Sequence, residues 1–193
     1  EDADSKHDMG GNIIPAFVAQ GTAHVYDFST NVVPGQTKRE RSYWRDVGTL
    51  DAYFQANMDT IAVDPIFSFY NRRWPILTHR PPLPPAKFVF DLDDRRGAAH
   101  ESIVGAGVVI SGGTARRSIV SSDVRIHSYA SVEDSLLLNG VVVGRNAVVR
   151  RAIIDKNARI GKGVVIRSHE GEADRDEDVD SMRDGIVLLQ NSM

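Results

Sequence analysis

One short segment of the chain combines residue types that could hold a metal ion beside a phosphate. Tyr43–Thr49 (YWRDVGT) places the carboxylate of Asp46 between an aromatic pair and a Gly-Thr pair, and a helical apolar pattern follows from Leu50 to Ile61. If the aromatic pair ends a strand, Asp46 lies between a strand and a helix, at the sheet edge where α/β proteins bind ligands. It can hold Mg²⁺ beside a polyphosphate, because Mg²⁺ prefers oxygen ligands. The same position also allows Asp46 simply to cap the helix.

Other groups that could do chemistry are few. His127 lies in the repetitive part of the chain, where it could act as the general base of an acyltransferase, and the other five histidines lack the spacing of metal ligands. The chain has no Cys, which excludes a thiolate nucleophile and a zinc site of the CxxC type. The aspartates of residues 170–184 suggest a calcium loop, but Val179 stands where the turn glycine belongs and Gly185 where the bidentate Glu belongs. We therefore expect a solvated acidic loop there.

Aliphatic residues recur at a nearly constant interval of five or six positions over residues 104–166. They are Val104, Ile110, Val120, Ile126, Val132, Leu138, Val143, Val149, Ile154, Ile160 and Ile166. This period matches neither a helix nor a plain strand, and it predicts a β-solenoid in which stacked coils share one continuous core. The single ten-residue interval, between Ile110 and Val120, predicts that Gly112–Arg117 loops out of the coil. A β-sandwich is the alternative, but sandwiches do not keep one interval through so many steps.

The segments around the repeats have mixed patterns. In residues 1–80, Asn12 is expected to cap a helix, and residues 23–28 alternate as a strand does. Clustered prolines and a charged run predict a stiff linker over residues 81–100. Ile186–Leu189 is expected to form a closing strand. The predicted fold class is α/β in the first part and all-β in the second.

Charge and composition narrow the possible partners. A net charge of −3 over 193 residues gives no global basic surface for nucleic acid, and no apolar run approaches the roughly 18 residues that span a bilayer. The absence of Cys is consistent with the cytoplasm. Because the first residue is Glu1 and no signal peptide is visible, we expect the chain to begin after processing or partway through a longer protein. Residues 104–166 carry nine basic and four acidic residues, which indicates either a solvated outer face or a site for a phosphorylated small molecule.

Several strings, in collinear order, resemble glucose-1-phosphate adenylyltransferase (ADP-glucose pyrophosphorylase), the bacterial enzyme that opens glycogen synthesis. They are His7–Pro15, Tyr43–Asp59, Tyr70–Ile76, Leu83–Val89, Ile110–Gly113 and Ile153–Gly163. The resemblance implies a Rossmann-like nucleotidyltransferase domain followed by a left-handed parallel β-helix of hexapeptide repeats. Residues 1–80 would then be the incomplete end of the catalytic domain and residues 81–100 the linker. Residues 101–193 would form the β-helix with its closing strand, for regulation and oligomerisation.

The resemblance also implies which residues act. Asp46 matches the second magnesium-binding carboxylate of the family, so it is expected to be catalytic and a metal ligand. Lys156 matches a basic side chain that contacts an inhibitory nucleotide, so it is expected to be allosteric. Substrate-binding residues would lie upstream of Glu1, and the chain alone would be inactive. The implied reaction transfers AMP from ATP to α-D-glucose 1-phosphate with Mg²⁺, in a cytoplasmic homotetramer that binds a phosphorylated effector and neither nucleic acid nor membrane.

Three alternatives stay open on the sequence. Asn12, where many relatives have Asp, would fit a non-catalytic regulatory subunit of the same family. Another sugar-phosphate nucleotidyltransferase is possible, since the base-reading loop would also lie upstream of Glu1. A free-standing hexapeptide acyltransferase would rely on His127, but it leaves residues 1–80 without a role. The identity and sign of the effector stay open as well.

Overall fold

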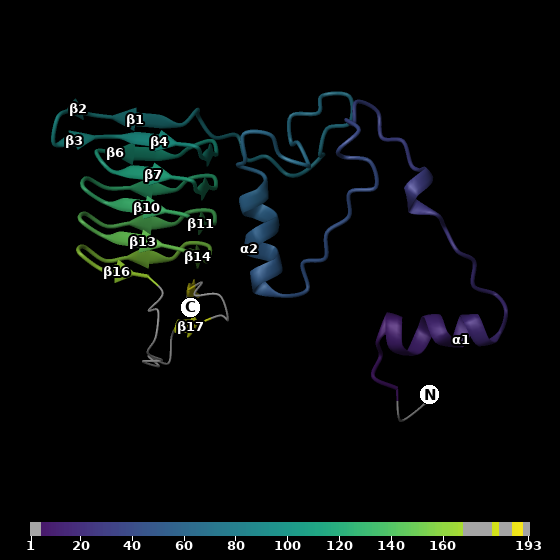
Figure 1. The fold of residues 1–193 in the computed structure, drawn as a ribbon. Helices are drawn as coiled ribbons and strands as arrows, with labels where there is room; N and C mark the ends of the chain where they lie inside the picture. Colours follow the sequence, from purple (N-terminus) through teal and green to yellow (C-terminus); the bar gives the residue numbers. More distant parts are fainter. Residues whose placement is uncertain (1–4, 168–178, 182–186, 191–193) are drawn as a thin grey trace.

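The chain forms short helical elements in its first part and a stack of short strands in its second (Figure 1). The computed structural model describes residues 5–167, 179–181 and 187–190. The helical elements are η1 (Met9–Ile13, a π-helix), α1 (Ile14–Ala19), η2 (Phe28–Thr30, a 3₁₀-helix) and α2 (Leu50–Asp59). No helix in these residues is long and apolar enough to cross a membrane.

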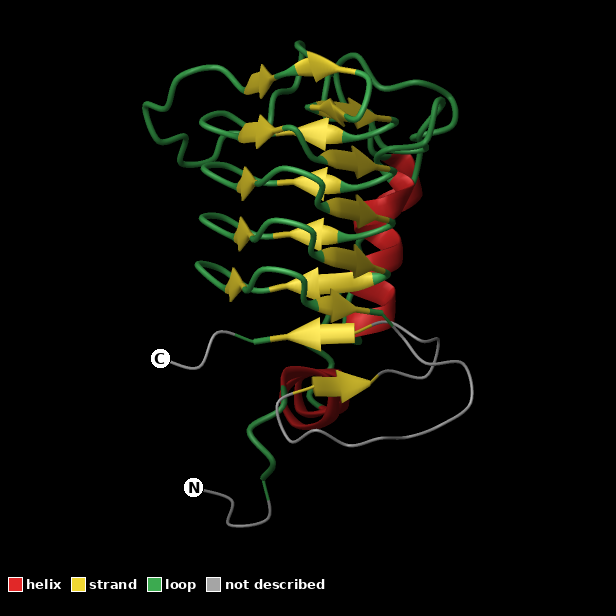
Figure 2. Ribbon diagram, turned by 90° about the vertical axis from the view of Figure 1, so that its left-hand side faces the viewer, coloured by secondary structure: helices red, strands yellow, loops and turns green. Residues whose placement is uncertain are grey.

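Three parallel sheets form the flat sides of a solenoid (Figure 2). The first sheet contains β1 (Lys87–Val89), β6 (Val109–Ser111), β9 (Arg125–Ile126), β12 (Val142–Val143) and β15 (Arg159–Ile160). The second contains β4 (Ala98–His100), β7 (Thr114–Arg116), β10 (Ser131–Glu133), β13 (Val148–Arg150) and β16 (Val165–Ile166). The third contains β5 (Ile103–Val104), β8 (Ile119–Val120), β11 (Leu136–Leu137), β14 (Ala152–Ile154) and β18 (Val187–Leu189), with β17 (Val179–Ser181) antiparallel to β18. A hairpin of β2 (Asp91–Leu92) and β3 (Arg95–Arg96) extends from the first coil.

The register of the strands explains the sequence period. Val109 pairs with Arg125 and Arg125 with Val142, so one coil takes 16 or 17 residues and adds one strand to each sheet. Most strands of the three sheets turn an apolar side chain inward, where it stacks on its counterpart in the next coil. Ile110, Ile126 and Val143 are fully buried in this way. The parallel β-helix predicted from the repeat is confirmed.

The prediction that residues 112–117 leave the coil is wrong. They include β7, which pairs with β4 on one side and β10 on the other, and Ala115 is fully buried in the core. Ala115 occupies the inward position between Ile110 and Val120. The aliphatic pattern missed it because alanine is small and was not counted among the aliphatic residues. The inward residue of β11 is likewise Leu137, whereas Leu138 packs against a cluster outside the coil.

The corner between the second and third sheets repeats in each coil. Glu101, Arg117, Asp134 and Arg151 all have positive φ angles, between 42° and 49°, although none is glycine. Such a conformation costs an L-residue about 1–2 kcal/mol, and it persists here because the turn requires it at the same point of successive coils. The backbone N–H of Asp134, for example, donates to the carbonyl of Arg116 in the preceding coil at 3.1 Å.

Buried serines complete this corner. The hydroxyl of Ser135 donates to the Glu133 carbonyl at 2.7 Å and accepts the N–H of Ala152, one coil further on, at 3.2 Å. Ser118 repeats the arrangement one coil earlier, donating to Arg116 and accepting from the N–H of Ser135. The serine side chains therefore satisfy backbone groups at this corner of the solenoid.

Helix α2 covers the outer face of the third sheet. The helix begins at Leu50, as the apolar pattern after Thr49 predicts. Thr49 is its cap, and Phe54 is buried against outward side chains of the sheet. Those side chains are Ile119, Leu136, Ile153 and Leu188. Figures 1 and 2 show the helix alongside the stacked coils. The outer face of this sheet is thus apolar because it is an interface, not a solvated side.

The first 30 residues differ from the sequence prediction. The helix begins at Met9, and the side chain of Asp8 is its cap, accepting the N–H of Gly11. Asn12 instead accepts the N–H groups of Lys6 and Asp8 with its side-chain oxygen. Residues 23–27 form no strand, because none of the described residues provides a neighbouring strand for their backbone groups.

The segment expected as a linker enters the solenoid earlier than residue 101. The first strand, β1, begins at Lys87, and its pairing with β6 joins residues 22 positions apart, such as Lys87 and Val109, in a first coil that includes the β2–β3 hairpin. The carbonyl of Pro84 accepts the N–H of Gly107 at 2.6 Å, and Ala86 packs against the core. The prolines therefore lie along the first coil. The expected closing strand corresponds to β18; Ile186 and most of the acidic stretch 170–184 lie outside the described residues.

Candidate functional site

The loop before α2 holds Asp46 in a tight turn. The Oδ1 atom of Asp46 accepts the backbone N–H of Gly48 at 2.9 Å, and the Oγ1 atom of Thr49 accepts the N–H of Ala52 at 3.1 Å. Thr49, not Asp46, is therefore the residue that caps the helix. Asp46 is exposed, and its Oδ2 atom has no hydrogen-bond or ion-pair partner within the described part of the chain. One carboxylate oxygen is thus available to a ligand.

A second contact fixes the same loop to the other end of the helix. Arg45 forms an ion pair with Asp59, the last residue of α2, with a nitrogen–oxygen distance of 3.0 Å. Both side chains are partly exposed, so the pair is of modest strength. The ion pair mainly fixes the geometry of the loop, because the loop is joined to the beginning of α2 through Thr49 and to the end of α2 through Arg45. Nothing in the sequence spacing alone indicated this pair.

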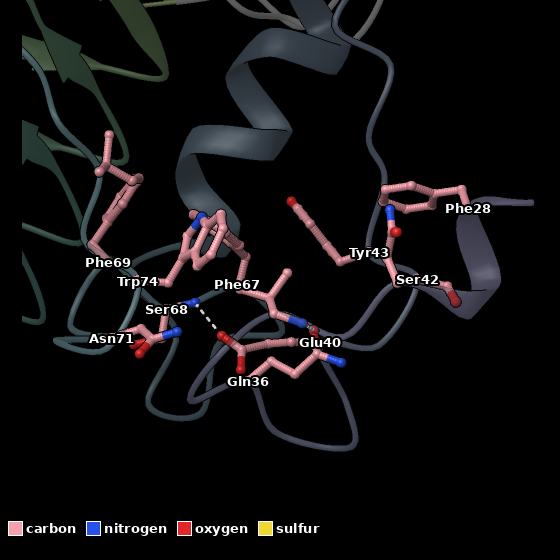
Figure 3. A pocket seen from close by; sticks show the side chains of 13 residues that line it. Phe28, Gln36, Glu40, Ser42, Tyr43, Phe67, Ser68, Phe69, Asn71 and Trp74 are labelled. Carbon is pink, nitrogen blue, oxygen red and sulfur yellow. Dashed lines mark hydrogen bonds between the residues drawn. The ribbon is translucent and has the colours of Figure 1, made fainter. Parts of the chain in front are cut away.

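The first part of the chain also contains a pocket of about 220 Å³ (Figure 3). Aromatic rings form part of its wall: the rings of Tyr43 and Phe67 stack at 5.3 Å, and Phe67 meets Phe69 edge-on at 5.6 Å. Asp46 does not line it. The pocket therefore lies beside the YWRDVGT segment without including its carboxylate.

The electrostatics of this pocket disfavour anions. The carboxylate of Glu40 accepts the N–H of Thr37 at 2.6 Å and the N–H of Ser68 at 3.1 Å. These hydrogen bonds lower the pKa of Glu40, with the bond from Thr37 the largest cause, so the side chain is charged at neutral pH. The pocket lining contains no Lys, Arg or His. A phosphorylated ligand would meet a negative charge with no compensating cation there.

A second hollow, of about 320 Å³, lies between the end of α2 with the residues after it and a corner of the solenoid. Met58 and Ile61 form its apolar side, and Arg117 lies on the other side. Arg117 makes two 2.7 Å hydrogen bonds to the carboxylate of Asp134, and the proximity of Asp134 raises the pKa of Arg117. The cation is therefore already neutralised within the protein and is not offered to a ligand.

The residues singled out in the sequence belong to different elements, and no contact between them is present in the described residues. Asp46 precedes α2, while Lys156 is exposed at the turn between β14 and β15, where its N–H donates to Asp155 at 2.7 Å. His127 is exposed just after β9 on the first sheet. The described residues include no group of three or more His, Cys, Asp or Glu that could hold a metal ion. Any metal bound by Asp46 would need further ligands, such as phosphate oxygens.

Comparison with known proteins separates the same two regions. Residues 84–189 match the family described as GlmU-like, C-terminal hexapeptide, and residues 1–62 match the family described as nucleotidyl transferase. The chain belongs to the GlmU-like hexapeptide family. The match begins in the proline segment that packs on the first coil, which agrees with the strand pairing of β1.

Curated relatives confirm the resemblance drawn from the sequence. A glucose-1-phosphate adenylyltransferase of Frankia casuarinae is 59% identical over 86% of this chain and 40% of its own length. The proteins of the same name from an Arthrobacter and an Anaeromyxobacter are both 48% identical, over 98% and 100% of this chain. The chain spans 40% and 47% of the length of those two relatives. The similarity therefore covers both regions of this chain but less than half of each relative.

Proposed function

We propose that this chain is part of a glucose-1-phosphate adenylyltransferase, which transfers AMP from ATP to α-D-glucose 1-phosphate and releases pyrophosphate, for glycogen synthesis. The observation that carries the proposal is the identity of 48–59% to enzymes of that name across both regions of the chain. At such identity over nearly 200 residues, the segment around Asp46 and the solenoid belong together as in those enzymes. Since the chain spans about 40% of their length, it supplies only part of the active site.

Exposed apolar side chains in the first part of the chain support this view. Val25, Val63 and Leu77 are almost fully exposed, and Trp44 and Tyr70 are largely so. Apolar surface of this extent is typical of a contact face, here a face toward further parts of a catalytic domain. A free-standing solenoid enzyme acting through His127 would not need these side chains.

Asp46 fits the role of a magnesium ligand by its donor chemistry. It offers one free carboxylate oxygen, and Mg²⁺ is commonly bound by one or two carboxylates together with substrate phosphates. A bound Mg²⁺ would supply charge neutralisation at the phosphates. In the reaction, an oxygen of glucose 1-phosphate attacks the α-phosphorus of ATP in line and pyrophosphate leaves. Such a reaction needs little covalent help from the protein, so the residues of the chain mainly position the reacting groups. Arg45 and Thr49 support this by fixing the loop that carries Asp46.

The solenoid would carry regulation and assembly. Lys156 is exposed at a solenoid turn and is the proposed contact for a phosphorylated effector, since an ammonium group at a surface attracts phosphate. The aromatic pocket around Glu40 is a poor alternative for such an effector because it lacks cations. We further propose a cytoplasmic homotetramer that binds neither nucleic acid nor membrane.

The proposal predicts a large effect of one carboxylate. In the full-length protein, Asp46→Asn should lower kcat by roughly 10²-fold, about 3 kcal/mol in the barrier, because a neutral amide binds Mg²⁺ poorly. Pyrophosphate release at saturating Mg²⁺ measures it, with Asp94→Asn on the exposed β2–β3 hairpin as the matched control. Turnover of Asp46→Asn near that of the control would overturn the metal assignment. Faster reaction with GTP, UTP or dTTP than with ATP would overturn the adenylyl specificity.

A further inference from the structure

We propose that the solenoid positions Asp46, with Phe54 as the positioning residue and α2 as the rigid connection between them. The inference rests on the proposed function for what Asp46 does, but not for how its position is set. The described chain before residue 108 has a single buried residue, which is Phe54 with 3% of its surface exposed. Every other side chain from residue 5 to residue 86 is at least partly exposed.

The first step of the connection is the anchor on the third sheet. Phe54 packs among Ile119, Leu136, Ile153 and Leu188, which come from four successive strands of that sheet. Tyr53, Met58 and Ile61 add partly buried contacts around it. Because this cluster joins α2 to side chains of four stacked strands, α2 cannot shift along the sheet without breaking these contacts. The anchor therefore makes α2 follow the solenoid.

The second step runs from the helix to the carboxylate. Thr49 caps α2 through the N–H of Ala52, and Gly48, directly before it, donates its N–H to Asp46 Oδ1. Only three residues separate Asp46 from the first residue of the helix. The turn is closed by hydrogen bonds at each step, so the orientation of the carboxylate is tied to the orientation of α2.

The third step closes the loop from the other side. The ion pair of Arg45 with Asp59 joins the residue next to Asp46 to the last residue of α2. The loop is thus fixed at both ends of one helix, and the helix is fixed on one sheet. A change in the solenoid that moves its third sheet would move Asp46 as part of the same body.

The inference predicts that weakening the anchor loosens the turn of Asp46 without a change at Asp46 itself. In the full-length protein, Phe54→Ala should speed amide exchange of Gly48, measured by NMR, by roughly 10-fold, because the hydrogen bond to Asp46 reports the turn directly. Phe54→Leu, which keeps an apolar contact, should give a smaller increase. Gln55→Ala, on the exposed side of α2, is the matched control and should leave the exchange unchanged.

A second readout uses Mn²⁺ as a paramagnetic probe in the presence of ATP, whose phosphates supply further ligands, with Mn²⁺ affinity measured by electron paramagnetic resonance. Weaker Mn²⁺ binding by Phe54→Ala, together with faster Gly48 exchange, supports both the positioning role and the metal role of Asp46. Faster exchange with unchanged Mn²⁺ affinity keeps the positioning role and overturns the metal assignment. Unchanged Gly48 exchange in Phe54→Ala, with amides of α2 itself now exchanging faster, overturns the inference. Unchanged exchange throughout α2 also overturns it, because the anchor would then fix nothing.

Discussion

The solenoid and the first 86 residues bury their apolar side chains in different ways. In the solenoid, Ile110, Ile126, Leu137 and Val143 are fully buried, and nearly identical coils supply the partners of each. In residues 5–86 only Phe54 is buried, and the buried side chains that it packs with belong to the solenoid. A repeat can bury its own apolar side chains by stacking, whereas a mixed segment needs a surface from elsewhere. The comparison explains why the solenoid provides the apolar surface on which the first segment packs, and why the first segment does not provide one for the solenoid.

The largest expected difference between the regions concerns apolar truncation. Leu137→Ala should lower the free energy of unfolding by about 2–5 kcal/mol, because a stacked core cannot close around the cavity. The control is Val25→Ala in the first region, where the side chain is 99% exposed and the change should stay within about 0.5 kcal/mol. Urea unfolding monitored by circular dichroism measures both. Similar effects at the two positions would contradict the contrast.

A smaller effect separates two positions within the solenoid. Ser135→Ala should destabilise by about 1–3 kcal/mol, because the Glu133 carbonyl and the Ala152 N–H lose a buried partner. Ser102 makes the same kind of bonds, to His100 and from Ser118, at the more exposed first coil. Ser102→Ala should therefore cost less, since water can replace the hydroxyl. Thermal unfolding of the two variants ranks them, and equal losses would show that burial is not the deciding factor.

The smallest expected effect is a titration in the first region. Hydrogen bonds from Thr37 and Ser68 lower the pKa of Glu40, so ionised Glu40 stabilises its loop. A lowered pKa in the folded state means that this contribution is present above the unfolded pKa and is lost as the pH falls through the folded pKa. The Ser68 amide shift in NMR should report a midpoint below the ordinary value of a glutamate. Glu40→Gln should remove that step, and a midpoint above the ordinary value would contradict the hydrogen-bond geometry.

Sequence reasoning succeeded where the signal was local. The repeat of aliphatic residues predicted the β-helix, and the apolar spacing after Thr49 predicted α2, because both follow from the geometry of a single stretch of chain. It failed where partners come from elsewhere. Residues 23–28 alternate like a strand but find no neighbour among the described residues. Lys87–Val89 carries charge and follows prolines, yet it becomes a strand because β6 lies one coil away.

Some residues of the candidate site could likewise be identified from the sequence, and others only from the structure. The YWRDVGT string and Lys156 could be chosen from the sequence through family resemblance, and Asp46 as a carboxylate ahead of a helix could be chosen from spacing. The ion pair of Arg45 with Asp59 could not, since both are ordinary surface residues in sequence. The pocket around Glu40 could not either, because Tyr43 and Phe67 meet only in the folded loops.

By itself, the sequence indicated that the chain would coil into stacked short strands, since a β-sandwich does not keep one interval of five or six positions through so many steps. It also determined that a helix would follow the carboxylate of Asp46. Only the tertiary structure decided where that helix would rest: four stacked strands present one apolar face, and a single phenylalanine fits it. The reason is that coil stacking brings together outward residues about 17 positions apart, as in the pairing of Leu136 with Ile153, whose common face exists only after folding.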